Sequence, residues 1–134
     1  MTIKWEDSYS VGISSIDEQH KIFFSLMNEV TSSYYEKKSL EVMEKIFKEL
    51  FDYANYHFST EERYFEEFKY EGAPLHIEEH KNYIKRLSEI QTKLSEDHTK
   101  AAVELVDFME DWFVHHINLV DKQYTECFQE HGLK

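Results

Sequence analysis

Glycine and proline are scarce in this chain of 134 residues, and their positions divide it into long uninterrupted segments. There are three glycines and one proline: Gly12 near the start, Gly72 and Pro74 together in the middle, and Gly132 near the end. A fold built from β-strands needs many more of these turn-forming residues. The segments between them are rich in Glu, Lys, Leu, Phe and Tyr, which indicates long helices.

These segments predict four helices that follow an N-terminal arm. The arm covers residues 1–14, and the helices run at about 15–36, 39–68, 74–95 and 99–130. Ser14 with Asp17, or Ser15 with Glu18, would cap the first helix, and Pro74 suits the first turn of the third. Short connections place consecutive helices antiparallel. The expected fold is all-α: an up-down-up-down antiparallel four-helix bundle that forms one domain over residues 1–134.

Charge and composition exclude several classes of protein. The formal net charge is −12, which argues against nonspecific binding to nucleic acid or anionic lipid. No apolar run exceeds three residues, so membrane insertion is not expected, and the first residues show no apolar export signal. The single cysteine, Cys127, fits a reducing cytoplasm. We therefore expect a cytoplasmic protein, and we expect it to be a monomer.

The predicted interior stripes of the helices are apolar except where they contain histidine or glutamate. Core positions in a bundle recur at alternating steps of three and four. Polar residues interrupt all four stripes, at His20, at His57 and Glu61, at His76 and His80, and at His116. In an up-down-up-down order all of these lie toward the same end of the bundle. A buried polar group without a partner costs about 1–3 kcal/mol, so six of them need something that binds them together.

Imidazole and carboxylate side chains together suit iron, zinc, copper or manganese. Five imidazoles are more than one four-coordinate zinc ion can use, so two metal ions fit better than one. A single histidine on an apolar face is more often a hydrogen-bonded core residue than a ligand. The alternative to a metal site is thus a plain helical bundle with polar core residues, and the number of these residues argues against it.

The same residues form a pattern that resembles the hemerythrin family, and most closely its single-domain bacterial members. The matching segments are Val11-Gly12-Ile13, Ile16-Asp17-Glu18-Gln19-His20-Lys21, His57-x3-Glu61, His76-x3-His80 and His116-x4-Asp121, with Trp5 and Tyr9 in the arm. The resemblance covers nearly the whole chain. Single pieces such as His-x3-His are common on helices, but all seven ligand positions in order are highly specific.

The resemblance implies two iron ions, cycling between Fe2+ and Fe3+, joined by an oxo or hydroxo bridge. It implies that His76, His80 and His116 hold one iron and that His20 and His57 hold the other. Glu61 and Asp121 would bridge the two, and O2 would bind at the iron with two histidines. Asp121 is the least comfortable of these assignments, since it lies five residues after His116, about 140° around an ideal helix. Its carboxylate must reach in from the edge of the stripe, or the helix must distort locally.

The resemblance also implies an apolar pocket for O2 beside the irons. The residues expected to line it are Phe23, Phe58, Trp112, Ile117 and Leu119. Such a pocket favours O2 and offers no positioned acid or base. His98, His115, His131 and Cys127 are expected to have no role in the site, and the charged pair Glu78-Glu79 is interpreted as solvated surface.

The function predicted on these grounds is reversible O2 binding, for storage, delivery or scavenging, and not catalysis. The alternatives are a di-iron oxidase or peroxidase, and a sensor or store for O2 or iron. Oxygen-activating ferritin-like sites use Glu-x-x-His pairs and several carboxylates. No glutamate stands three residues before any of the five histidines here. Delivery would require an O2-using enzyme as a partner.

Overall fold

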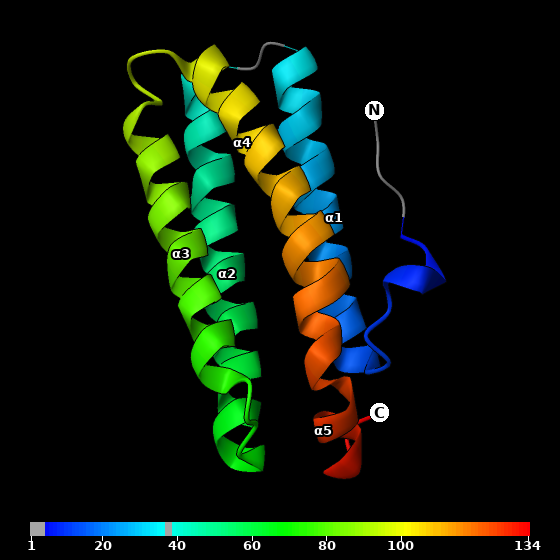
Figure 1. The fold of residues 1–134 in the computed structure, drawn as a ribbon. Helices are drawn as coiled ribbons and strands as arrows, with labels where there is room; N and C mark the ends of the chain where they lie inside the picture. Colours follow the sequence, from blue (N-terminus) through cyan, green and yellow to red (C-terminus); the bar gives the residue numbers. More distant parts are fainter. Residues whose placement is uncertain (1–4, 37–38) are drawn as a thin grey trace.

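A computed structural model describes residues 5–36 and 39–134, and all regular structure in these ranges is helical. The elements are the 3-10 turn η1 (Asp7–Tyr9), α1 (Ser14–Tyr35), α2 (Leu40–Phe68), α3 (Ala73–Thr92), α4 (His98–Trp112), η2 (Phe113–Val120), η3 (Asp121–Tyr124) and α5 (Thr125–Glu130). The last four follow one another without a break in a single rod (Figure 1). One helix was predicted over 99–130, whereas the rod changes its winding from α to π at Phe113.

The four long helical segments form the predicted all-α four-helix bundle. Figure 1 shows α1 and α3 running in one direction and α2 and α4 in the other. α1 packs against α2 and α4, and α3 packs against the same two helices. The start of α1, the turn between α2 and α3, and α5 therefore lie at one end of the bundle (Figure 1). No helix within the described ranges is long and apolar enough to cross a bilayer.

The interior consists of two apolar clusters, which are separated along the helices by the polar residues. The larger cluster includes Phe23 of α1 and Met109 of α4. The smaller one, at the end near α5, comprises Val11, Ile13, Ile16, Phe65, Tyr124 and Phe128. On α1, for example, buried His20 stands between Ile16 of the smaller cluster and Phe23 of the larger. Each cluster closes off one side of a buried polar layer.

The first helix begins differently from the prediction. Its N-cap is Ile13, and no side chain caps it. The Ser14 hydroxyl donates to the carbonyl oxygen of Lys134 (3.0 Å). The Asp17 carboxylate accepts from the Ser10 hydroxyl (2.5 Å) and from the Val11 amide (2.8 Å). The two caps predicted for α1 are thus wrong, because tertiary partners compete for the same side chains.

The other helix starts follow ordinary capping rules. Ser39 accepts from the Val42 amide at the start of α2, and Asp97 accepts from the Lys100 amide at the start of α4. Pro74 occupies the first turn of α3, as predicted.

The N-terminal arm ties α1 to the end of the rod. Lys122 donates to the Ser8 carbonyl (2.6 Å), Thr125 to that of Val11 (2.5 Å) and Gln129 to that of Gly12 (2.9 Å). The rings of Trp5 and Tyr9 pack against Phe24, and Tyr9 also meets Phe113, with ring centroids 4.8–5.5 Å apart. The arm therefore braces the segment that immediately follows Asp121.

Gly12 is the residue of this brace whose backbone conformation favours glycine. Its φ is +79°, and a Cβ would stand 2.9 Å from Gln129 Nε2 and 3.3 Å from Thr125 Cγ2. We expect Gly12→Ala to lower the free energy of unfolding by about 1–2 kcal/mol, because left-handed backbone is strained in any residue with a Cβ. The close contact of the added Cβ with Gln129 and Thr125 should make this loss larger than that of a glycine with the same strain in open space. Chemical denaturation of the metal-free protein measures this. Gly132→Ala is the matched control, since Gly132 also has a positive φ but an added Cβ meets nothing within 4 Å. Equal losses in the two variants would show that the contact with the rod contributes nothing.

Candidate metal centre

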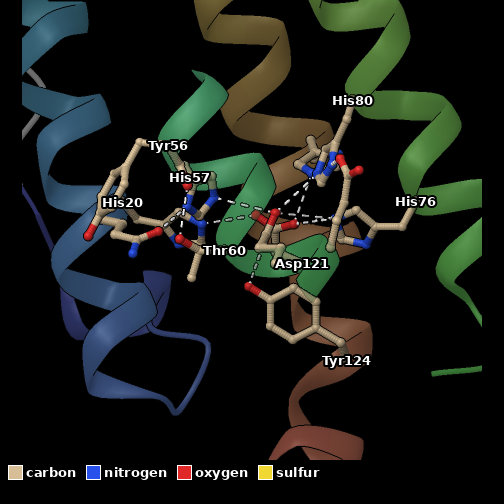
Figure 2. Close-up of polar contacts among 12 residues, drawn as sticks. His20, Tyr56, His57, Thr60, His76, His80, Asp121 and Tyr124 are labelled. Carbon is tan, nitrogen blue, oxygen red and sulfur yellow. Dashed lines mark hydrogen bonds and ion pairs between the residues drawn. The ribbon is translucent and has the colours of Figure 1, made fainter. Parts of the chain in front are cut away.

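The seven residues singled out from the sequence lie together inside the bundle. None has more than 2% of its surface exposed, and every long helical segment contributes at least one. Figure 2 shows imidazoles from α1, α2 and α3 pointing toward the interior of the bundle, where Asp121 lies. Asp121 Oδ1 is 2.8 Å from His76 Nε2 and 2.9 Å from His116 Nε2, while Oδ2 is 3.0 Å from His20 Nε2. The two oxygens of this carboxylate thus face different histidines.

Glu61 stands between the same two sets of histidines. Its Oε1 atom is 3.0 Å from His80 Nε2 and 3.5 Å from His57 Nε2. Its Oε2 atom accepts a hydrogen bond from the Tyr124 hydroxyl (2.5 Å), which fixes the carboxylate (Figure 2). Side-chain atoms that lie within 4.8 Å of one another form two groups: Glu61 with His76, His80 and His116, and Glu61 with His20, His57 and Asp121.

Asp121 reaches the interior because the rod is a π-helix where it approaches the site. The Asp121 amide donates to the His116 carbonyl, five residues earlier, as in a π-helix. Because a π-helix has more residues per turn than an α-helix, five residues on from His116, Asp121 lies closer to the same face than α winding would place it, and both side chains are buried in the bundle. Of the two possibilities left open by the 140° offset, the helix takes the local distortion.

The same change of winding overturns the pocket assignment of Leu119. The α-helical period placed Leu119 on the interior stripe, one turn after His116. In the wider π turn it leaves that stripe, and 57% of the side chain is exposed. Of the other predicted pocket residues, Phe23, Phe58 and Ile117 are buried and Trp112 is half-buried.

Atoms that face the centre of the cluster lack hydrogen bonds. Within the described residues no hydrogen-bond partner meets the following atoms: Nε2 of His20, His57, His76, His80 and His116, Oε1 of Glu61, and Oδ1 and Oδ2 of Asp121. The histidine Nε2 atoms lie 2.8–3.7 Å from carboxylate oxygens of Glu61 and Asp121, as ion pairs, but the directions between these atoms do not suit hydrogen bonds. Leaving so many buried polar atoms unpaired is expensive. Convergent imidazole and carboxylate atoms of this kind fit transition-metal ions.

The electrostatics keep the two carboxylates ionised. Burial alone would raise the pKa of Asp121, but His116, His20 and His76 hold it well below its usual value. The pKa of Glu61 is lowered in the same way against the effect of burial, by His57, His76 and His80. Both carboxylates therefore carry the negative charge that a cation needs.

The histidines divide by their surroundings. Burial lowers the pKa of His57 to about 4. Burial acts in the same direction on His76, but the negative charges of Asp121 and Glu61, whose oxygens lie 2.8 and 3.7 Å from Nε2, outweigh it and raise the pKa of His76 to about 10. A cation that bound His57 would meet a neutral imidazole, whereas one that bound His76 would displace a proton.

Three of the five imidazoles use their outer nitrogen in hydrogen bonds that the sequence analysis missed. His57 Nδ1 donates to Gln19 Oε1 (2.6 Å), His80 Nδ1 to Glu62 Oε2 (2.9 Å) and His116 Nδ1 to Glu79 Oε1 (3.0 Å). The interpretation of Glu79 as mere solvated surface is therefore wrong. The available signal was adjacency, because each of the three acceptors is next to a site residue on its own helix: Gln19 is next to His20, Glu62 to Glu61 and Glu79 to His80.

Aromatic rings cover the imidazoles on the side of the larger apolar cluster. Trp112 stacks on His116 and Phe58 on His80, with ring centroids 3.9 and 3.8 Å apart. Tyr53 lies parallel to His57, and Tyr83 contacts Trp112 at 4.7 Å. The hydroxyls of both tyrosines are buried without a hydrogen-bond partner in the described structure. The sequence analysis predicted an apolar pocket, whereas this region also contains two buried hydroxyl groups.

The remaining histidines lie outside the cluster. His98 is exposed at the start of α4. The side chain of His115 is 71% exposed, and its Nε2 is 3.7 Å from Glu79. His131 donates to the Cys127 carbonyl and stacks on Phe68.

Five imidazoles and two shared carboxylates inside a helical bundle are typical of metal-binding helical proteins. Comparison with known protein families places the chain in this class. The family model described as "Hemerythrin HHE cation binding domain" matches residues 11–127. The chain belongs to the hemerythrin family.

Relatives in sequence and solved structures match this chain over most of its length. The bacteriohemerythrin of Clostridium acetobutylicum is 32% identical over 127 residues, which cover 91% of this chain and 98% of that protein. The bacteriohemerythrin of Pseudomonas aeruginosa is 29% identical, over 92% of this chain and 79% of that protein. A crystal structure of a hemerythrin with a leucine-to-alanine mutation superposes with a TM-score of 0.82 at 25% identity, covering 95% of this chain and 98% of the other.

Glu61 is the side chain whose loss should affect metal binding most broadly, because it belongs to both groups of the cluster. We expect Glu61→Gln to weaken binding of a second metal ion more than His98→Ala or His115→Ala. The glutamine keeps the shape and an oxygen for Tyr124 but removes the charge shared by both groups. Anaerobic titration of the metal-free variants with Fe2+ measures this. An equal loss from His115→Ala would mean that the wrong member of the His115-His116 pair has been assigned.

Proposed function

We propose that this chain binds O2 reversibly at a pair of iron ions. The observation that carries the proposal is the sharing of Glu61 and Asp121 between two sets of histidines. A single-metal site has no use for two carboxylates placed in this way. Membership of the hemerythrin family supports iron as the metal.

His76, His80 and His116 would hold one iron, and His20 and His57 the other. Glu61 and Asp121 would bridge them, together with an oxo or hydroxo group. The distances support this division, since Asp121 Oδ1 faces His76 and His116 while Oδ2 faces His20. When bound, such a pair of ions supplies one electron each to O2 and recovers it when O2 leaves. The half with two histidines has the fewer protein ligands and is the half at which O2 would bind.

The chain's own residues serve this function by holding the ligands and excluding water. Phe23 and Ile117 are buried in the larger apolar cluster. Trp112 and Phe58 lie flat on two of the imidazoles. An enclosure of this kind favours a small apolar molecule over water and anions. Storage, delivery to an O2-using enzyme and scavenging are the uses that this chemistry fits, in a cytoplasmic monomer with one domain over residues 1–134.

One observation favours a second candidate function, that of a di-iron oxidase or peroxidase. The hydroxyls of Tyr53 and Tyr83 are buried and unpartnered beside rings that contact site histidines. Phenol groups so placed can donate a hydrogen bond or an electron to an oxygen species. The small number of carboxylates in the cluster argues for the carrier.

The proposal predicts about two irons per chain and a colour change that reverses. Protein expressed with ample iron is analysed for metal, reduced without air, and followed by visible spectra through cycles of air and argon. We expect an absorption band that appears in air and disappears under argon. One tightly bound zinc with no uptake of iron would contradict a di-iron centre. Irreversible oxidation, with steady consumption of hydrogen peroxide and a reductant, would instead support the enzyme.

Trp112 should protect the oxygenated protein from water. Its ring stacks on His116 with centroids 3.9 Å apart, and it is half-buried. We expect Trp112→Ala to return from the oxygenated to the oxidised state faster, by about tenfold or more, because solvent gains access to the centre. The iron content should not change, since no ligand is lost. Stopped-flow mixing with O2, followed by visible spectra over hours, gives the rate.

Leu119→Ala is the matched control for this variant. Leu119 neighbours the same stretch of the rod but is 57% exposed. Its truncation should leave the rate unchanged. If both variants behave like the parent, the aromatic cover has no part in protecting the site.

A further inference from the structure

The outer nitrogens of the imidazoles are treated differently in the two halves of the cluster. In the half with three histidines, His80 and His116 donate to the carboxylates of Glu62 and Glu79. In the half with two histidines, His57 donates to the neutral amide of Gln19. His20 and His76 have no partner at Nδ1 within the described residues, which leaves one such imidazole in each half. The halves therefore differ by two negative charges just behind their ligands.

A carboxylate behind an imidazole changes its properties as a ligand. It fixes the proton on Nδ1, so that Nε2 presents its lone pair inward, and it makes that lone pair more basic. An amide oxygen fixes the same tautomer without adding charge. In metalloproteins, removal of such an outer partner typically costs about 10–100-fold in metal affinity.

We propose that Glu62 and Glu79 are positioning residues that make the half with three histidines the tighter metal site. Gln19, because it is neutral, leaves the half with His20 and His57 as the weaker site, which fills second and exchanges its metal more readily. This inference rests on the metal-ligand assignments of the proposed function. It goes beyond them by assigning the order of loading and the residues that set it.

The two glutamates are well placed for substitution. Their side chains are 37% and 29% exposed, so a change at either one leaves no buried cavity. Glu62 lies in an open groove of about 350 Å³ between α2 and α3, next to His80. The full chain should fold normally with glutamine at either position, since glutamine keeps an oxygen that can accept the imidazole proton.

The test is a titration of the metal-free protein with Co2+, followed by visible absorption. The two stepwise dissociation constants are compared for the parent, Glu62→Gln and Glu79→Gln. The matched controls are Glu66→Gln on α2 and Glu78→Gln on α3, which remove the same charge from exposed positions of the same helices. We expect the tighter constant to rise about tenfold or more in Glu62→Gln and Glu79→Gln. The weaker constant should change far less, and the controls should match the parent.

The exchangeable ring N–H signals in the NMR spectrum of the Co2+-loaded protein provide a second readout. With one equivalent of Co2+, the signals of His80 and His116 should be shifted by the metal, and that of His57 should not. Glu79→Gln should then move the His116 signal alone, which a general effect on folding would not do. If the first Co2+ instead shifts the His57 signal, the proposed order of loading is wrong.

The outcomes separate this inference from the proposed function. If two Co2+ ions bind but Glu62→Gln and Glu79→Gln behave like their controls, the two glutamates do not set the affinity and the inference fails alone. If the parent binds one Co2+ or none, the two-metal centre itself is contradicted.

Discussion

The rest of the structure depends on the carboxylate of Asp121. It contacts histidines from α1, α3 and the π segment of the rod, all within 3.0 Å. Such an arrangement cannot be built in part, because a buried charge whose partners are removed costs several kcal/mol. The position of three helical segments is thus coupled to one side chain. The arm accepts hydrogen bonds from Lys122 and Thr125, which follow Asp121 on the rod. These bonds help to hold the rod in the position that Asp121 requires.

Placement of the polar layer between two apolar clusters explains how the bundle accommodates it. Hydrophobic burial on both sides supplies the stabilisation that the layer does not. Phe65 and Tyr124 close the side near the end of the bundle, and Phe23 and Met109 belong to the other side. Tyr124 also has a second role, because its hydroxyl donates a hydrogen bond that holds the Glu61 carboxylate in place. The cluster is therefore positioned by groups that do not bind metal themselves.

The sequence predicts what depends on a regular helical period, and fails where the period changes or where partners come from distant segments. His20, His57, Glu61, His76 and His80 lie at interior positions of α-helices, and all are buried. His116 lies only three residues after the π segment begins, and it is still on the interior side. Leu119 and Asp121 come late in or directly after the π segment, and no residue type in the sequence indicates that the helix changes to π winding there. Asp121 could be named only through the family pattern, and Leu119 was placed on the wrong face.

The helical period also cannot predict the residues that hydrogen-bond to the proposed ligands. Glu62 and Glu79 are half-exposed and have the composition of ordinary surface. Only a structure shows that each accepts a hydrogen bond from an imidazole of another helix. The capping of α1 was mispredicted in the same way, because Ser14 and Asp17 bond to the C-terminus and the arm.

The charge on the cluster gives these outer glutamates a physical purpose. In the proposed centre, two ferric ions would carry six positive charges, and Glu61, Asp121 and one oxo bridge would offset four of them. Two positive charges would then remain in a site shielded from water, where they would be poorly solvated. Glu62 and Glu79 place two negative charges within hydrogen-bonding distance of the ligands, and both stand behind the same half. The compensation would therefore be uneven: the half with three histidines would be stabilised in its oxidised state, while the half with His20 and His57 would keep more of its positive charge. A less compensated positive charge would attract a negatively charged ligand, so the half that the proposal makes the weaker metal site would also be the half better suited to such a ligand.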